Sequence, residues 1–313
     1  MTRTALSLLA VVAATAGCRT TPPVVLASPG ALTPASSQVA TVTGTGFAGP
    51  ENVVYDSAAD VFLVSNVNGG PAARDDNGFV TRVAPDGRVI ALKWIAGGAH
   101  GAVLDAPKGL AIRGDTLAVA DVGAVHFFDR RTGAPLGSVA LPGLVMNDLA
   151  FASDGTLWIT DTGPNRGTGG APTDTTRDMD AVWRVLPGGA VRAAARGLAL
   201  GRPDGIVLDG ADALVATFGA NRIERVAARG DSGWVGVATL PGGRVDGLRR
   251  LPDGALVVTS WDAGTVWRLA PGGAPWPMLT GVTSPAGVAV DTRRHRLAVT
   301  SMQGDALYLL PLR

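Results

Sequence analysis

The stretch RVDGL at residues 244–248 decides the fold, because close variants of it recur along the chain. Each copy combines a turn containing Gly, Pro or Asp with a short apolar strand. The copies are GPENVVYD (49–56), APKGLA (106–111), MNDLA (146–150), RPDGI (202–206), RVDGL (244–248) and SPAGV (284–288). They follow one another at intervals of about 40 to 57 residues. The chain is therefore predicted to consist of one structural unit present six times.

The segments after each copy predict further strands of the same unit. Second apolar strands are expected at 117–121, 157–161, 214–217, 256–260 and 297–301, and third strands at 78–83, 125–129, 181–185, 222–226, 265–269 and 306–310. These strands are apolar on both faces, which is typical of sheets stacked face to face. A helical solenoid would show a 3.6-residue periodicity over longer segments, and the sequence does not show it. The repeat length is that of a four-stranded blade, so residues 38–313 are predicted to form an all-β, six-bladed β-propeller.

The two ends of the repeat region predict how the ring closes. The last copy has only about three strands before Arg313, whereas QVATVTGTG (38–46) is an isolated strand before the first copy. We expect this N-terminal strand to be added to the last blade. Such closure removes an exposed sheet edge that would otherwise favour aggregation.

Composition limits the classes of function. The chain has 313 residues, of which 46% are hydrophobic and 17% charged, so it can bury a large core and is not a disordered polymer. Its 43 glycines and 21 prolines are spread along the chain, as many turns require. The net charge is +1 without a basic stripe, which argues against nucleic acid as a partner. We expect a monomer with a small-molecule substrate.

The N-terminus predicts export. Residues 1–18 form a signal peptide, with Arg3 as its positive residue, a short apolar run at 5–14 and small residues before Cys18, the single cysteine. This segment resembles a bacterial lipoprotein signal, in which the cysteine is lipidated, although Thr15 stands where that motif usually has Leu. An ordinary secretory signal is the alternative. Residues 19–37, rich in Pro, Ser, Thr and Ala, are expected to be a flexible tether, and a lipid on Cys18 would be the sole membrane attachment of a periplasmic or cell-envelope lipoprotein.

The start of the first strand in each copy predicts a metal site. In a propeller these strands line the centre, so their first residues converge; they are Glu51, Lys108, Asn147 with Asp148, Asp204, Asp246 and Ala286. Carboxylates so close together require a compensating cation. Oxygen ligands of this kind suit Ca²⁺, with Mg²⁺ or Mn²⁺ as alternatives, and no His or Cys cluster indicates zinc.

These residues carry a resemblance to a known family. The chain resembles the gluconolactonase and senescence-marker-protein (regucalcin) family of six-bladed propellers, and is more distantly similar to diisopropyl fluorophosphatase and paraoxonase. The resemblance implies that Glu51, Asn147, Asp204 and Asp246 hold a calcium-type ion and that Asp246 is also the catalytic base. Asp204 replaces an amide of the family's pattern with a carboxylate.

Lys108 and Asp148 are predicted to contact the substrate. Lys108 is one of two lysines in the chain and enters the ring of acids. Its ammonium group would anchor an anionic group of the substrate, or would pair with the acids and partly replace the metal. The sequence leaves these two roles open.

The expected activity is a metal-dependent hydrolase of the lactonase or esterase class, with Asp246 as base or nucleophile. The three histidines lie in no motif of a serine hydrolase or zinc protease. The alternative is a non-catalytic envelope propeller that binds a ligand or a protein, and a third option is a strictosidine-synthase-like propeller without calcium. Two polar insertions, 68–77 and 163–180, are expected to flank the metal site.

Overall fold

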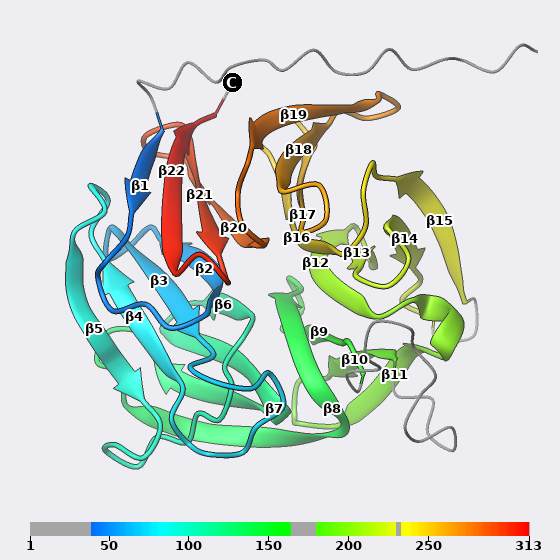
Figure 1. Ribbon diagram of the computed structural model, residues 1–313. Helices are drawn as coiled ribbons and strands as arrows, with labels where there is room; N and C mark the ends of the chain where they lie inside the picture. The colour runs from blue at the N-terminus through cyan, green and yellow to red at the C-terminus, as the bar shows by residue number, and fades with distance from the viewer. Residues whose placement is uncertain (1–38, 164–179, 230–232, 313) are drawn as a thin grey trace, which may run out of the picture. The chain divides into compact units, whose positions relative to one another are not determined.

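The computed structural model describes residues 39–163, 180–229 and 233–312, all within the unit Pro34–Arg313 (Figure 1). This part of the chain is almost entirely β, with one short 3₁₀ turn, η1 (Leu198–Leu200). No helix in these ranges is long and apolar enough to cross a membrane. The predicted signal peptide, the lipidation motif at Cys18 and the tether lie outside the described residues, so they stay predictions.

The strands form antiparallel sheets in which neighbours along the chain are hydrogen-bonded. The first sheet holds β2 (Pro50–Asp56), β3 (Val61–Asn66), β4 (Phe79–Val83) and β5 (Val89–Ala96). The second holds β6 (Leu110–Arg113), β7 (Thr116–Asp129), β8 (Pro135–Phe151), β9 (Leu157–Asp161), β10 (Ala181–Val185) and β11 (Val191–Arg196). The third holds β12 (Pro203–Asp209), β13 (Asp212–Thr217), β14 (Arg222–Val226) and β15 (Trp234–Thr239). The fourth holds β16 (Val245–Arg250), β17 (Leu256–Ser260), β18 (Thr265–Leu269) and β19 (Pro275–Thr280). The fifth holds β20 (Pro285–Asp291), β21 (Arg296–Ser301), β22 (Ala306–Pro311) and β1 (Ala40–Val42).

The arrangement is propeller-like, but the prediction of six separate blades is wrong, because the strands form five hydrogen-bonded sheets. The difference arises in the six-stranded sheet. Strand β7 reverses direction at Gly123 (φ 71°). The residues that flank its two ends lie side by side after this reversal, because Arg130 N donates to Asp115 O at 2.8 Å. Strand β8 pairs with β7 through its first part and with β9 from Met146 onward, which joins two predicted blades into one sheet.

Six strands nevertheless line the centre, because the six-stranded sheet supplies two of them. Strands β2, β6, β8, β12, β16 and β20 each lie beside the next, and β20 contacts β2. The N-terminal strand β1 pairs with β22, with Ala40 opposite Leu309. It therefore belongs to the sheet of the C-terminal strands, and the closing of a ring by this strand stays a prediction.

The core lies between the sheets. Strand β3 is buried on both faces, and its Leu63 packs with Leu110, Leu117 and Phe128 of the neighbouring sheet. This face-to-face packing explains why the repeat has apolar residues in succession rather than strict alternation.

Glycines let the inner strands approach closely. A Cβ atom on Gly205 would lie 2.4 Å from Asp246 O, and one on Gly247 would lie 2.4 Å from Ala286 O. Register shifts mark a bulge beside these glycines, between Pro203 and Ile206 in β12 and between Val245 and Leu248 in β16. The Asp-Gly pairs of the repeat therefore serve both packing and the placement of the acidic side chain.

Candidate metal centre

Three carboxylates meet where the inner strands begin. Glu51, Asp204 and Asp246 are the second residues of β2, β12 and β16, and a carboxylate oxygen of each lies within 4.8 Å of one from the other two. All three side chains are buried. We call these three residues the acidic cluster.

Asn147 joins the acidic cluster from β8. Its Nδ2 donates to Asp204 Oδ2 at 2.8 Å and to Thr162 Oγ1 at 2.9 Å. Its Oδ1 is buried and has no donor among the described residues, and the same holds for Glu51 Oε2. Three carboxylates and the amide oxygen of Asn147 form the oxygen-rich set that Ca²⁺ prefers, and two of these oxygens have no donor within the described ranges, so the residues present fit a calcium-type ion.

The electrostatics of the acidic cluster also favour a cation. Burial raises the pKa of Glu51 well above its ordinary value, the charge of Asp204 raises it further, and Lys108 opposes the rise. Burial followed by the charge of Asp246 raises the pKa of Asp204. Burial followed by the charge of Glu51 raises the pKa of Asp246, while the indole of Trp261 partly lowers it. The ionised cluster is thus only partly compensated by the cationic side chains around it.

This imbalance predicts a pH dependence of the metal-free protein. A carboxyl group with a raised folded-state pKa binds protons more tightly when folded, so its contribution to stability is lost as pH rises through that pKa. Burial likewise raises the pKa of Asp161 to about 6. In chelator, the melting temperature should therefore rise as pH is lowered from about 8 to about 5. Saturating calcium should reduce this rise, and a melting temperature that falls over the same range in chelator would contradict the assignment.

Lys108 lies just before β6 and is buried. Its Nζ donates to Ala106 O at 2.7 Å. Burial lowers the pKa of Lys108, whereas the negative charges of Glu51 and Asp121 oppose that change. The ammonium group is therefore placed to interact electrostatically with the acidic cluster, and both roles proposed for Lys108, contact with substrate and partial replacement of the metal, stay predictions.

Asp148 lies in a different environment from its neighbour Asn147. Arg249 Nη1 donates to Asp148 Oδ2 at 2.7 Å, and Arg249 Nη2 lies 3.3 Å from Asn52 Oδ1. Asp148 Oδ1 also accepts a hydrogen bond from Asn52 Nδ2 at 3.2 Å. These contacts tie β8, β16 and β2 together and engage both carboxylate oxygens, so substrate binding by Asp148 stays a prediction without a structural argument of its own.

Sequence reasoning missed Arg249 and Trp261. Arg249 lies in β16, one residue beyond the repeat copy at 244–248, and a charged residue directly after that apolar stretch is the signal that could have revealed it. Trp261 directly follows β17, and its indole lies beside Asp246 and partly lowers the pKa of that carboxyl group. Both residues lie beside groups that the sequence did identify.

The two insertions differ in what the structure describes. The segment 68–77 is held in place because Asn68 Nδ2 donates to Asn77 O at 2.9 Å and Asp76 N to Asp105 Oδ1 at 3.0 Å. It follows β3 and thus lies at the end of the sheet where β2 begins. Most of the segment 163–180 falls outside the described residues, so its predicted place beside the metal site is untested.

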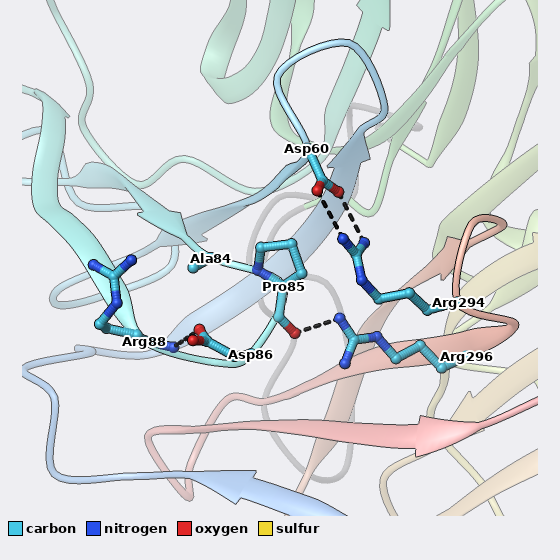
Figure 2. A pocket seen from close by; sticks show the side chains of 7 residues that line it. All are labelled: Asp60, Ala84, Pro85, Asp86, Arg88, Arg294 and Arg296. Atoms are coloured by element: carbon cyan, nitrogen blue, oxygen red, sulfur yellow. Dashed lines mark hydrogen bonds and ion pairs between the residues drawn. The ribbon is translucent and has the colours of Figure 1, made fainter.

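A surface depression of about 430 Å³ lies at the other end of the sheets (Figure 2). Turns after β2, β4 and β20 form it, whereas the acidic cluster lies where the inner strands begin. Arg294 Nη2 binds Asp60 Oδ2 at 2.7 Å, and Arg296 donates to Pro85 O and Asp291. Both arginines therefore connect turns of neighbouring sheets, and this depression is not part of the candidate centre.

The comparisons with known proteins concern the fold. The chain superposes on a structural-genomics target whose name marks gluconolactonase as a provisional assignment, with a TM-score of 0.68, 20% identity and coverage of 88% of this chain and 91% of that one. A gluconolactonase from Xanthomonas campestris gives a TM-score of 0.67 at 23% identity, covering 88% and 89% of the two chains. The chain shares their fold. A virginiamycin B lyase from Staphylococcus aureus also matches, with a TM-score of 0.60 at 14% identity and coverage of 88% and 99%. No family model and no curated protein matches the sequence.

Proposed function

We propose that this protein is a calcium-type metal-dependent hydrolase that opens a lactone or ester. The observation that carries the proposal is the acidic cluster, three buried carboxylates with oxygen atoms within 4.8 Å of one another. Glu51 Oε2 within this cluster and Asn147 Oδ1 beside it are buried acceptors without donors among the described residues. Gluconolactonase-like structural neighbours support a lactonase-type activity. Because lyases share the fold, the fold alone does not select the reaction.

Glu51, Asn147, Asp204 and Asp246 would hold the ion. When bound, a divalent ion polarises the carbonyl group of the substrate and neutralises developing negative charge. Asp246 would accept a proton from the water molecule that adds to the carbonyl carbon. The acyl C–O bond then breaks, and Asp246 returns the proton to the leaving oxygen, which yields a hydroxy acid from a lactone or an acid and an alcohol from an ester. The Trp261 indole beside Asp246 would orient its carboxylate.

The proposed substrate is a small molecule with an anionic group, which Lys108 would attract. We also propose that the protein is exported and held at the cell envelope through lipidated Cys18, and that it acts as a monomer. The N-terminal sequence supports the first of these proposals, and its test is metabolic labelling with a radioactive or alkyne-bearing fatty acid in the wild type and in Cys18→Ser.

One observation favours the alternative of a non-catalytic binding module. The buried ammonium group of Lys108 already compensates part of the charge of Glu51. If this were sufficient, the acidic cluster would need no metal and the protein would hydrolyse nothing. A calcium titration of chelated protein, with bound ion and rate of lactone hydrolysis measured together, separates the two functions.

A further inference from the structure

Two arginines occupy equivalent positions in neighbouring sheets. Arg202 and Arg244 each lie two residues before a carboxylate of the acidic cluster. In both sheets the residue after the second strand closes the turn onto the arginine backbone, since Phe218 N donates to Arg202 O at 2.8 Å and Trp261 N to Arg244 O at 3.0 Å. All four residues therefore lie at the end of the sheets that carries the candidate centre.

The side chains of these four residues stack in one row. The guanidinium carbon of Arg202 lies 5.0 Å from the centroid of the Phe218 ring, and that of Arg244 lies 5.4 Å from the Trp261 ring. The two rings meet edge to face, with centroids 5.3 Å apart and an interplanar angle of 81°. We call these residues the arginine–aromatic row. Stacking holds a guanidinium group in place, and its N–H groups point outward in the ring plane, as bidentate binding of a carboxylate requires.

The backbone at both arginines is left-handed. Arg202 has φ 59° and Arg244 has φ 50°, and the equivalent positions of the first and fifth sheets carry Gly49 (φ 60°) and Ser284 (φ 45°). Glycine adopts this conformation without steric cost, but a residue with a Cβ does not. In two neighbouring sheets this position carries a long cationic side chain at a steric cost that glycine would avoid.

Arg244 has capacity for a ligand. Its side chain is 45% exposed and pairs with Asp262, which is 43% exposed. Asp262 engages Nε and Nη2, and Nη1 has no partner among the described residues. An ion pair this exposed contributes little to stability, so Asp262 would compete only weakly with a bound anion for the guanidinium group of Arg244.

The arginine–aromatic row makes the side chains around the candidate centre differ from one sheet to the next. The positions equivalent to Phe218 and Trp261 carry Val67, Val122 and Met302 in other copies, and these three residues pack in one apolar group. Cationic and aromatic side chains at these repeat positions are thus confined to the sheets that supply Asp204 and Asp246. A ligand carboxylate would be attracted to this side of the centre.

We propose that the arginine–aromatic row binds a carboxylate group that the substrate carries beside its scissile lactone or ester bond. The proposal rests on the hydrolytic function proposed above. Arg244 would form paired N–H···O bonds to the carboxylate, Arg202 would add a second positive charge, and the faces of the aromatic rings would contact the adjoining carbon skeleton. The row would thereby offset the repulsion between an anionic substrate and the acidic cluster.

The test compares two probes, γ-butyrolactone and its 5-carboxylate, as substrates of the wild type and of Arg244→Gln with saturating calcium. We expect the ratio of kcat/KM for the carboxylated over the neutral lactone to fall at least tenfold in the variant, mainly through KM. Arg250→Gln is the matched control, because Arg250 is the last residue of β16, the strand that Arg244 immediately precedes, and it pairs with Asp209 at the far end, so the ratio should not change. An unchanged ratio in Arg244→Gln would overturn the proposal.

A second substitution separates recognition from a structural role. Arg244→Gly relieves the left-handed backbone, so the melting temperature of this variant should be at least that of the wild type. The ratio of kcat/KM for the carboxylated over the neutral lactone should still fall. A lower melting temperature with an unchanged ratio would show that Arg244 has a structural role only. If the wild type hydrolyses neither lactone, the proposed hydrolysis fails. Calorimetric binding of the ring-opened hydroxy-dicarboxylate then tests carboxylate recognition separately from hydrolysis. Binding that Arg244→Gln abolishes would support carboxylate recognition, and no binding by the wild type would overturn it.

Discussion

Replacing Asp246 by Asn should reduce lactone or ester hydrolysis by about 10²–10⁴-fold while the protein remains folded. Asn has nearly the same shape as Asp, but it accepts no proton from water, and it removes one negative charge from the acidic cluster. Steady-state rates at saturating calcium measure the effect, and circular dichroism and thermal unfolding check the fold.

Two features of this experiment make its outcome specific. If Asp246 serves only as a ligand, raising the calcium concentration should restore the rate of Asp246→Asn; if it is the base, the loss should persist at full occupancy. Asp253→Asn is the matched control, since Asp253 Oδ1 accepts from Ala255 N at 3.1 Å in the turn at the far end of the same strand. Normal turnover by Asp246→Asn would refute the proposed mechanism.

Replacing Gly247 by Ala should lower the free energy of unfolding by roughly 1–3 kcal/mol. The added Cβ would lie 2.4 Å from Ala286 O and 3.1 Å from Gly287 Cα, which are backbone atoms of the next inner strand and have little freedom to move. Because Asp246 is the adjacent residue, displacement of β16 should also weaken calcium binding. Urea denaturation gives the stability, and a calcium titration gives the affinity.

Gly236→Ala is the control for this substitution. The nearest atom to a Cβ on Gly236 is Glu224 Oε2 at 3.6 Å, an ordinary contact on an outer strand, so stability should change by no more than about 0.5 kcal/mol. Equal effects of the two substitutions would show that close contact between the inner strands does not limit the fold.

The repeat made the acidic cluster predictable, because a position that recurs at the start of each inner strand must face the centre. The same repeat position separates two kinds of Asp-Gly pair in the structure. Asp204 and Asp246 lie in the cluster, whereas Asp86 and Asp154 accept backbone hydrogen bonds from Arg88 and Thr156 in turns at the other end. Position within the repeat, not residue type, separates an Asp of the acidic cluster from an Asp that caps a turn.

Other features depend on contacts that periodicity does not encode. Two expected blades form one sheet because β7 reverses tightly at Gly123 and because β8 runs without a break from its pairing with β7 to its pairing with β9. A pattern of apolar residues does not show whether the strands on either side of a connection stay hydrogen-bonded to one sheet. The pairing of Arg249 with Asp148 joins residues 101 positions apart. Such a pairing becomes evident only when the inner strands are placed in space.

The calcium titration of chelated protein tests the central claim most directly. Equilibrium dialysis would give the bound ion, and the rate of lactone hydrolysis would be measured in the same samples of the wild type and of Glu51→Gln. We predict one tightly bound calcium ion per chain, a rate that rises in proportion to its occupancy, and loss of both at the same calcium concentrations in Glu51→Gln. Hydrolysis that persists unchanged in chelator, or a wild type that binds no calcium, would contradict the account.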